Sequence, residues 1–179
     1  MNMKRAIRWG IGLIAVAVIG LYGEYVREKL QLSPSLLLAC ADVEREPGAW
    51  TCRQILLRRT FTTEEIAQLN RDGGALFPVL AENPALAEEM LALFIERGVD
   101  VNAGEEKVRH WTALHAMAIE GDLARVQLLL RHGARADLQD SNGMTALDFA
   151  RKKLEELPSD PGRKEIVRLL EEVASRRAG

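Results

Sequence analysis

The feature that most constrains the fold is an internal repeat. Residues 111–115 read Trp-Thr-Ala-Leu-His, and residues 144–148, which begin 33 positions later, read Met-Thr-Ala-Leu-Asp. A second pair of similar segments, residues 93–98 and 128–133, lies 35 positions apart, and each ends in Gly. Periods of this length are typical of solenoids, in which a single repeat cannot bury its own apolar face and therefore stacks on its neighbours.

Each repeat is expected to contain two helices and a hairpin loop. Gly98 and Gly133 can end helices where a positive φ is needed, and Asp122 can cap the second helix of its repeat. The dipeptide of Asn142 and Gly143 favours a hairpin turn. The residues expected to face neighbouring repeats are Leu114, Ala118, Val126, Leu129 and Leu130.

This pattern resembles the ankyrin repeat. The central repeat matches best, with Thr-Ala-Leu-His at 112–115, Gly-Asp at 121–122 and Gly-Ala at 133–134. The resemblance covers residues 72–175 and implies an all-α solenoid of helix-turn-helix repeats with hairpin loops. It also implies that His115 is structural and ties its helix to the adjacent loop. The expected organisation is a transmembrane signal anchor at 1–29, a helical N-terminal cap at 30–71, and ankyrin repeats with a C-terminal capping repeat at 72–179.

The start of the chain has the layout of a secretory signal. Three basic side chains within the first eight residues precede an uncharged apolar run at 9–23. No cleavage pattern of small residues follows, so we expect an uncleaved anchor that crosses the bacterial inner membrane once and leaves the rest in the periplasm. A buried core helix is one alternative. A lipoprotein is another, since Leu-Leu-Ala-Cys at 37–40 would make Cys40 the acylated residue.

The chain has two cysteines, Cys40 and Cys52. They lie twelve positions apart, and the anchor places both in an oxidising compartment, where thiols tend to pair. We therefore predict a disulfide between them, and two buried thiols in a helix pair are the alternative. No third ligand of suitable spacing lies nearby in the sequence, so we predict no metal site and no cofactor.

Composition argues against nucleic-acid binding, and the absence of catalytic motifs argues against catalysis. The formal net charge is −2 and aromatic residues make up 5% of the chain, which leaves neither a basic surface nor a base-stacking platform. The sequence has no nucleophile elbow, phosphate-binding loop or metalloprotease motif. Of its three histidines, His115 and His132 are predicted to be structural. We therefore expect a protein-binding module rather than an enzyme, monomeric when free.

One loop departs from the repeat pattern. The loop at 103–111 is two residues longer than its counterpart and carries Trp111, a residue type often found as an interface anchor. Packing of Trp111 on the stem of Arg109 or on the neighbouring hairpin is the alternative. Variable positions of the central repeat and of the next hairpin complete the set. The candidate partner-binding residues are Lys107, Arg109, His110, Trp111, Ile119, Glu120, Arg135, Gln139, Asp140 and Asn142.

Two functional hypotheses fit these features, and a third is weaker. A single anchor, an outward ankyrin domain and no catalytic set resemble the small ankyrin proteins encoded beside bacterial type VI secretion toxins. That resemblance implies an immunity protein that blocks the active site of an incoming toxin, for example a phospholipase. The competing hypothesis is a periplasmic scaffold that supports a housekeeping enzyme, such as an antioxidant one. The weaker hypothesis is an enzyme whose site the motifs do not reveal.

Overall fold

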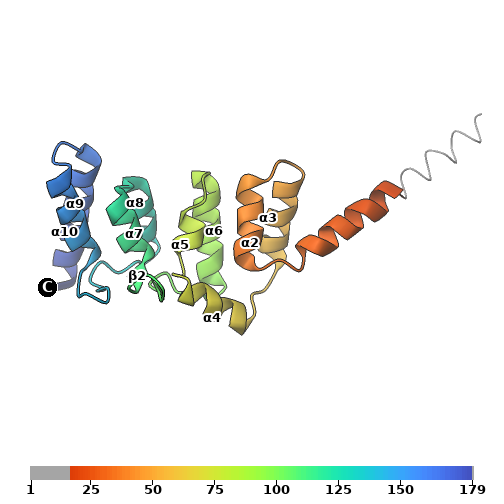
Figure 1. Cartoon of the computed structure of the whole chain (residues 1–179), viewed down its shortest axis with the longest axis horizontal. Helices are drawn as coiled ribbons and strands as arrows, with labels where there is room; N and C mark the ends of the chain where they lie inside the picture. Colours follow the sequence, from red (N-terminus) through yellow and green to blue (C-terminus); the bar gives the residue numbers. More distant parts are fainter. Residues whose placement is uncertain (1–16, 179) are drawn as a thin grey trace, which may run out of the picture. The chain divides into compact units, whose positions relative to one another are not determined.

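The computed structural model of the chain describes residues 17–178, whose backbone is mostly helical. It separates into two compact units, one ending at Arg59 and the other beginning at Thr60 (Figure 1). This boundary lies nearer the N-terminus than the junction at 71 and 72 that we expected. The reason is that the first helix after Thr60 packs on the repeats.

The first unit contains helical backbone at 17–29, α2 (Pro34–Val43) and α3 (Gly48–Arg58). The sequence starts α2 firmly, because the Ser33 hydroxyl accepts a hydrogen bond from the Leu36 amide and a proline occupies the first helical position. The helices pack against each other through Leu37 and Leu56, which are both fully buried. A disulfide joins Cys40 of α2 to Cys52 of α3, with their Cα atoms 5.9 Å apart.

The predicted membrane anchor falls largely outside the described residues. Of the segment at 1–29, only residues 17–29 belong to the part of the chain that the structure describes. Among residues 17–178, no helix has both the length and the apolar character needed to cross a membrane.

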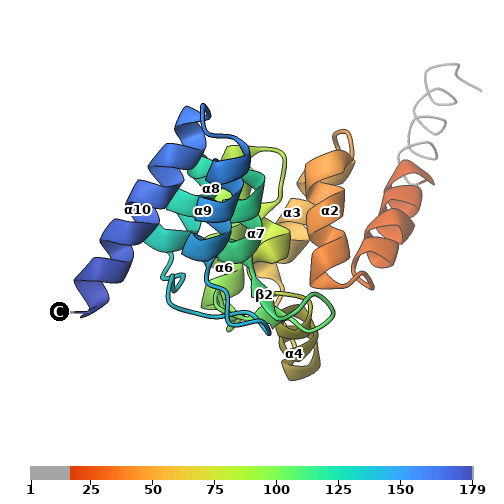
Figure 2. The same ribbon diagram turned by 60° about the vertical axis from the view of Figure 1, so that its left-hand side comes forward.

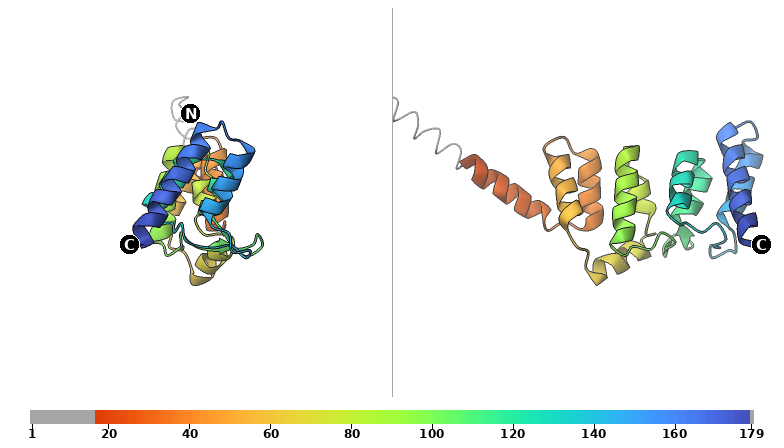
Figure 3. Two further views of the ribbon diagram at one scale, coloured as in Figure 1. Left: turned by 90° about the vertical axis from the view of Figure 1, so that its left-hand side faces the viewer. Right: turned by 180° about the vertical axis from the view of Figure 1, so that it is seen from behind.

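The second unit stacks helices in pairs. In Figures 1 and 3, α5 and α6 form the first pair, α7 and α8 the second, and α9 and α10 the third. Figure 2 shows the hairpin loops gathered at one end of these pairs. The elements of this unit are α4 (Thr63–Arg71), α5 (Leu76–Val79), α6 (Pro84–Glu96), β1 (Gly104–Glu105), β2 (Trp111–Thr112), α7 (Ala113–Glu120), α8 (Leu123–Arg131), α9 (Ala146–Glu156) and α10 (Pro161–Ala178).

The repeated Thr-Ala-Leu segments start α7 and α9, the first helix of each of their pairs, which we call the inner helices. At α9, the Asp148 amide donates to the Thr145 hydroxyl at 3.2 Å, and the Thr145 amide donates to the Asp148 carboxylate at 2.9 Å. At α7, the amide of Thr112 donates to Nδ1 of His115 at 3.2 Å in the same reciprocal position. Each pair satisfies backbone N–H groups that a helix N-terminus leaves without partners. The sequence repeat is therefore, in large part, a repeat of helix caps.

The core runs through all three pairs. Four of the five residues expected to face neighbouring repeats are buried, and Leu130 is half-buried because it borders an open groove with Leu169 and Val173 of α10. The largest fully buried side chains of this unit are Phe94, Met90, Leu91, Leu114, Met117, Leu129, Ile166 and Leu170.

Helix α4 belongs to the repeats through contacts at both of its ends. Near its start, the rings of Phe61 and Phe94 meet edge to face with centroids 5.1 Å apart. Near its end, Asn70 Oδ1 accepts a hydrogen bond from the Asp100 amide at 2.9 Å, and the Arg71 carbonyl accepts one from the Glu106 amide at 3.0 Å. These contacts explain why the compact unit begins at Thr60.

Two arginines link successive pairs. Residues 122–125 and 160–163 share an Asp-x-x-Arg pattern in which the aspartate accepts from the arginine's own amide and so caps its helix. The side chain of Arg125 donates to the Ala81 carbonyl at 3.1 Å, and that of Arg163 donates to the Ile119 and Glu120 carbonyls at 2.8 and 3.0 Å. Each arginine thus satisfies carbonyls at the C-terminal end of the preceding inner helix.

Candidate protein-binding surface

The long loop forms a tight β-hairpin. Strands β1 and β2 pair antiparallel, and the Trp111 amide donates to the Val108 carbonyl at 2.9 Å. Arg109 and His110 occupy the two central turn positions with φ of 52° and 57°. Two consecutive left-handed residues make this a type I′ turn, which Gly and Asn adopt with much less strain. Each such residue costs on the order of 1–3 kcal/mol, so the surrounding structure must hold the turn in place.

Neighbouring backbone holds this turn from two sides. The Arg109 carbonyl accepts a hydrogen bond at 2.8 Å from the amide of Ser141, which belongs to the next hairpin. On the other side, the His110 carbonyl lies so close to Gly104 that a Cβ atom at residue 104 would overlap it. The turn is therefore a preformed feature of the surface.

Trp111 is part of the support of this turn rather than of its exposed tip. Its indole N–H donates to Asp140 Oδ2 at 3.1 Å, and its ring meets Phe149 edge to face with centroids 5.2 Å apart. The side chain is half-buried. Packing on the neighbouring hairpin, the alternative considered for Trp111, is the arrangement that the structure shows.

Asp140 organises the next hairpin. Its side chain is buried, and Oδ1 accepts hydrogen bonds from the amides of Asn142 and Met144 at 2.8 and 2.9 Å. Burial acts to raise the pKa of the Asp140 carboxyl, but these hydrogen bonds and the one from Trp111 outweigh it and lower the pKa below 3.8. The carboxylate is committed to the turn, so Asp140 does not offer a free contact to a partner.

His115 ties helix α7 to the same hairpin. Its Nε2 lies 3.1 Å from the Met144 carbonyl, which can only accept, while Nδ1 faces the Thr112 amide. The ring is therefore neutral with its proton on Nε2. Burial lowers the pKa of His115 below 6.5, although the hydrogen bond to the Met144 carbonyl acts in the opposite direction. This helix-to-loop tie is the role that the sequence resemblance implied.

The remaining candidate residues fall into two groups. The first group is exposed on neighbouring hairpins and consists of Lys107, Arg109, His110, Arg135, Gln139 and Asn142. Within it, Arg135 pairs with Asp137 at 2.6 Å. The second group, Ile119 and Glu120, lies at the far end of α7, roughly 12 Å along the helix axis from the hairpins. The structure therefore gathers the first group on the hairpin side of the stack and places the second group at the opposite end of helix α7.

A groove of about 610 Å³ opens beside the second group. It is lined by Leu76, Leu80, Met117, Glu120 and Arg125, among others. Helix α5, which borders the groove at Leu76, has four residues, whereas α7, which borders it at Met117 and Glu120, has eight. Of the five lining residues named, only Glu120 is among the partner-binding residues predicted from the sequence. The spacing between the Gly-Gly pair at 73–74 and the cap of α6 at Asn83 does not reveal the short α5, because residues 75–82 would accommodate a helix as long as α7.

One cluster in the described part of the chain brings metal-ligand types together. Atoms of Cys40, Glu44 and Cys52 lie within 4.8 Å of one another, so a third ligand type is closer than the sequence suggested. The two sulfur atoms are bonded to each other and do not act as thiolate ligands in this state.

Comparison with known protein families now identifies the stack. Residues 79–175, more than half of the chain, match the family described as ankyrin repeats in three copies. The chain belongs to the ankyrin-repeat family. Ankyrin repeats are protein–protein interaction modules, so the exposed hairpins and the groove are candidate contact surfaces for another protein.

Several larger proteins share this ankyrin segment. The chain is 37% identical over 83 residues to the E3 ubiquitin-protein ligase Ufd4 of Drosophila melanogaster, and 38% identical over 63 residues to the human Inhibitor of Bruton tyrosine kinase. It is 34% identical over 74 residues to the putative palmitoyltransferase ZDHHC13 of Danio rerio. These matches cover 46%, 35% and 41% of this chain but only 3%, 5% and 11% of the three relatives, respectively. The similarity is thus confined to a small part of each relative.

Proposed function

We propose that this ankyrin protein is an immunity protein that binds and blocks an antibacterial toxin delivered by type VI secretion, such as a phospholipase. The observation that carries the proposal is the strained hairpin turn at Arg109 and His110, which is exposed and held by the next repeat. A narrow, preformed projection can enter the cleft of an enzyme without first being ordered, which removes part of the free-energy cost of binding. Strain kept at an exposed position is also typical of functional sites.

The side chains of the tip suit an enzyme cleft. Lys107 and Arg109 supply positive charge, and between them Val108 is 38% exposed. We infer that Val108 and Arg109 enter the toxin, while the groove beside Glu120 receives a second part of its surface. Trp111 supports the tip from behind and makes its contribution through the fold.

The same proposal places the repeats in the periplasm, held by an inner-membrane anchor at 1–29. The support for this placement is the basic start and the apolar run at 9–23. Alkaline phosphatase fused after Gly179 should be active, and the full-length protein should remain in the membrane fraction. A shortened, soluble form released from the periplasm would contradict an uncleaved anchor.

The decisive experiment is a competition assay. Deleting the gene should sensitise cells to sister cells that deliver the toxin, and the purified full chain should bind that toxin with Kd on the order of nanomolar. Arg109→Glu and Val108→Asp should weaken binding and protection strongly. Lys164→Glu, a charge reversal at an exposed site on α10, serves as the matched control and should do neither.

The competing hypothesis gives the opposite result in the same strain. A scaffold for a housekeeping or antioxidant enzyme predicts that the deletion strain survives competition and instead fails under oxidative stress. That result, or full protection by the Arg109→Glu variant, would overturn the immunity proposal.

A further inference from the structure

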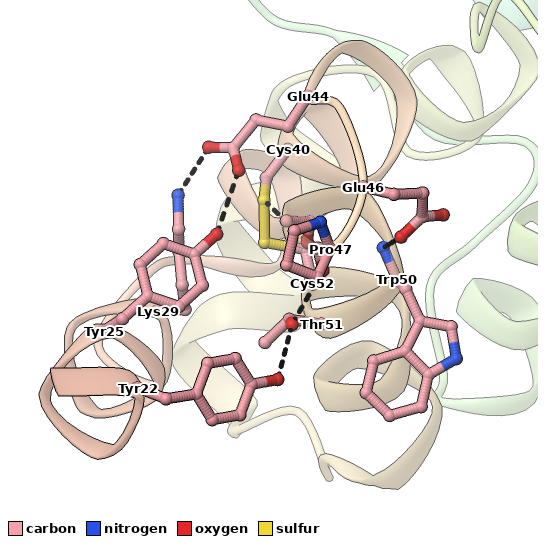
Figure 4. The surroundings of a disulfide bond; sticks show 11 residues. Tyr22, Tyr25, Lys29, Cys40, Glu44, Glu46, Pro47, Trp50, Thr51 and Cys52 are labelled. Carbon is pink, nitrogen blue, oxygen red and sulfur yellow. Dashed lines mark hydrogen bonds and ion pairs between the residues drawn. A yellow bond between two sulfur atoms is a disulfide. The ribbon is translucent and has the colours of Figure 1, made fainter. Parts of the chain in front are cut away.

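The first unit contains a set of polar contacts that the protein-binding surface does not use. Figure 4 shows the side chains of Tyr22, Tyr25 and Lys29 reaching from the helix at 17–29 toward the helical hairpin that α2 and α3 form. Tyr25 donates to Glu44 Oε2 at 3.1 Å, and Lys29 donates to Glu44 Oε1 at 2.5 Å. The hydroxyl of Tyr22 lies 3.0 Å from that of Thr51. The helix is thus held at two points, Glu44 after α2 and Thr51 on α3.

Gly48 makes room for the first of these points. A Cβ at this position would overlap Glu44 Oε2 and would lie 2.9 Å from the Tyr25 hydroxyl oxygen. The carboxylate and the phenol therefore occupy space that only glycine leaves free. A single methyl group at residue 48 would displace Glu44.

The disulfide joins the two elements that carry these points. Cys40 lies one helical turn before Glu44, and Cys52 follows Thr51 directly. Both cysteines are nearly inaccessible, with 7% and 0% exposure. The crosslink therefore lies within one helical turn of Glu44 and directly beside Thr51, and it fixes the distance between α2 and α3 at these two points. The geometry of Glu44 relative to Thr51 therefore depends on the crosslink.

We propose that Cys40 and Cys52 form a redox-sensitive clasp that keeps the helix at 17–29 docked on the hairpin. In the disulfide state, Glu44 and Thr51 are held at the separation that Tyr25 and Tyr22 require. A dithiol reductant cleaves the S–S bond: two electrons and two protons pass to the cysteine sulfurs, which become thiols, and the reductant becomes a disulfide. Without the crosslink the two points lose their fixed spacing, and the helix is released while α2 and α3 stay folded. The clasp thereby controls whether the helix at 17–29 stays on α2 and α3, whatever partner the repeats bind.

Hydrogen exchange of the full-length chain, followed by mass spectrometry, tests this device. Oxidised protein is compared with protein treated with a dithiol in the presence of a chelator, which prevents metal from bridging the freed thiols. Reduction should raise the exchange of the amides at 22–29 by about tenfold and should leave α6 and α8 unchanged, because opening is local. The variant with both Cys40→Ser and Cys52→Ser should exchange like the reduced protein and should not respond to the dithiol.

Two glycine variants separate docking from the crosslink. Gly48→Ala should raise exchange at 22–29 in the oxidised protein, although its disulfide is intact. Gly23→Ala is the control, since its added methyl group meets nothing within 4 Å, and it should not raise exchange. The clasp is refuted if reduction leaves exchange at 22–29 unchanged. It is equally refuted if reduction unprotects α2 and α3 as fully as 22–29, because the disulfide would then be a staple of the whole hairpin.

Discussion

At the scale of single residues, the turn at Arg109 and His110 separates the demands of folding from those of binding. Glycine would adopt both conformations at lower free energy, yet the chain places two long polar side chains there. Ser141 of the neighbouring hairpin holds the turn, and Trp111, in strand β2 of the same hairpin as the turn, supports it through its hydrogen bond to Asp140. Truncating Trp111 should therefore lower stability, in contrast to the neutral effect that an exposed tip residue would have.

The first prediction concerns the strain in this turn. His110→Gly should raise the free energy of unfolding by about 1 kcal/mol, because it relieves a left-handed conformation, and it should weaken binding to the partner. Urea denaturation of the full chain measures the first effect and titration with the partner the second. His110→Ala is the matched control: it removes the imidazole but keeps the Cβ, so it should weaken binding without stabilising the fold.

The second prediction concerns pH. Because the pKa of His115 is below 6.5 in the folded state, the unfolded chain takes up a proton more readily as the pH falls. The stability that neutral His115 provides is complete above about pH 6.5 and declines between that value and the lower pKa of the folded state. The denaturation midpoint should fall as the pH is lowered through this window. His110→Asn should keep the decline, whereas a midpoint independent of pH in this range would contradict it.

At the scale of elements, predictability from sequence followed the periodicity. The caps, the helix pairs from α6 to α10 and the glycine ends could be predicted because each depends on residues close together in the chain. The short length of α5 and the packing of α4 on the repeats could not be predicted from the sequence. The packing of α4 depends on contacts between residues far apart in the chain, such as Asn70 and Asp100, which are 30 positions apart. The Asp-x-x-Arg links were missed for the same reason.

The third prediction tests one of these links. Arg163→Met should keep the apolar stem but lose two hydrogen bonds to the C-terminal end of α7, at a cost of about 1–3 kcal/mol. Lys164→Met, at the adjacent exposed position, is the control and should be nearly neutral. Equal denaturation midpoints for the two variants would show that the link contributes nothing.

At the scale of the whole molecule, the stack has no independent repeat. Leu129 is fully buried in the central pair, which contacts helices on both sides. The candidate site was predictable in part: the unusual loop could be found from its length, but its strained turn and the supporting role of Trp111 could not. Both depend on where the next hairpin lies in space.

The fourth prediction follows from that dependence. Leu129→Ala should open a cavity, cost about 2–5 kcal/mol and lower partner binding indirectly, through loss of folded protein. Leu157→Ala, at a site that is 50% exposed, should cost much less. Partner affinity measured at a temperature where both variants are folded should equal that of the unmodified chain, and a selective loss at Leu129 would place recognition in the core.

The fixed hairpin turn also bears on how such a protein could change its partner over evolutionary time. The backbone of the tip is set by Gly104 and by the bond from Ser141 to the Arg109 carbonyl, and none of these contacts involves the side chains of Lys107 or Val108. Those side chains can vary while the platform stays the same. Diverging descendants that meet different partner proteins should therefore differ mostly at residues 106–110 and retain the supporting residues.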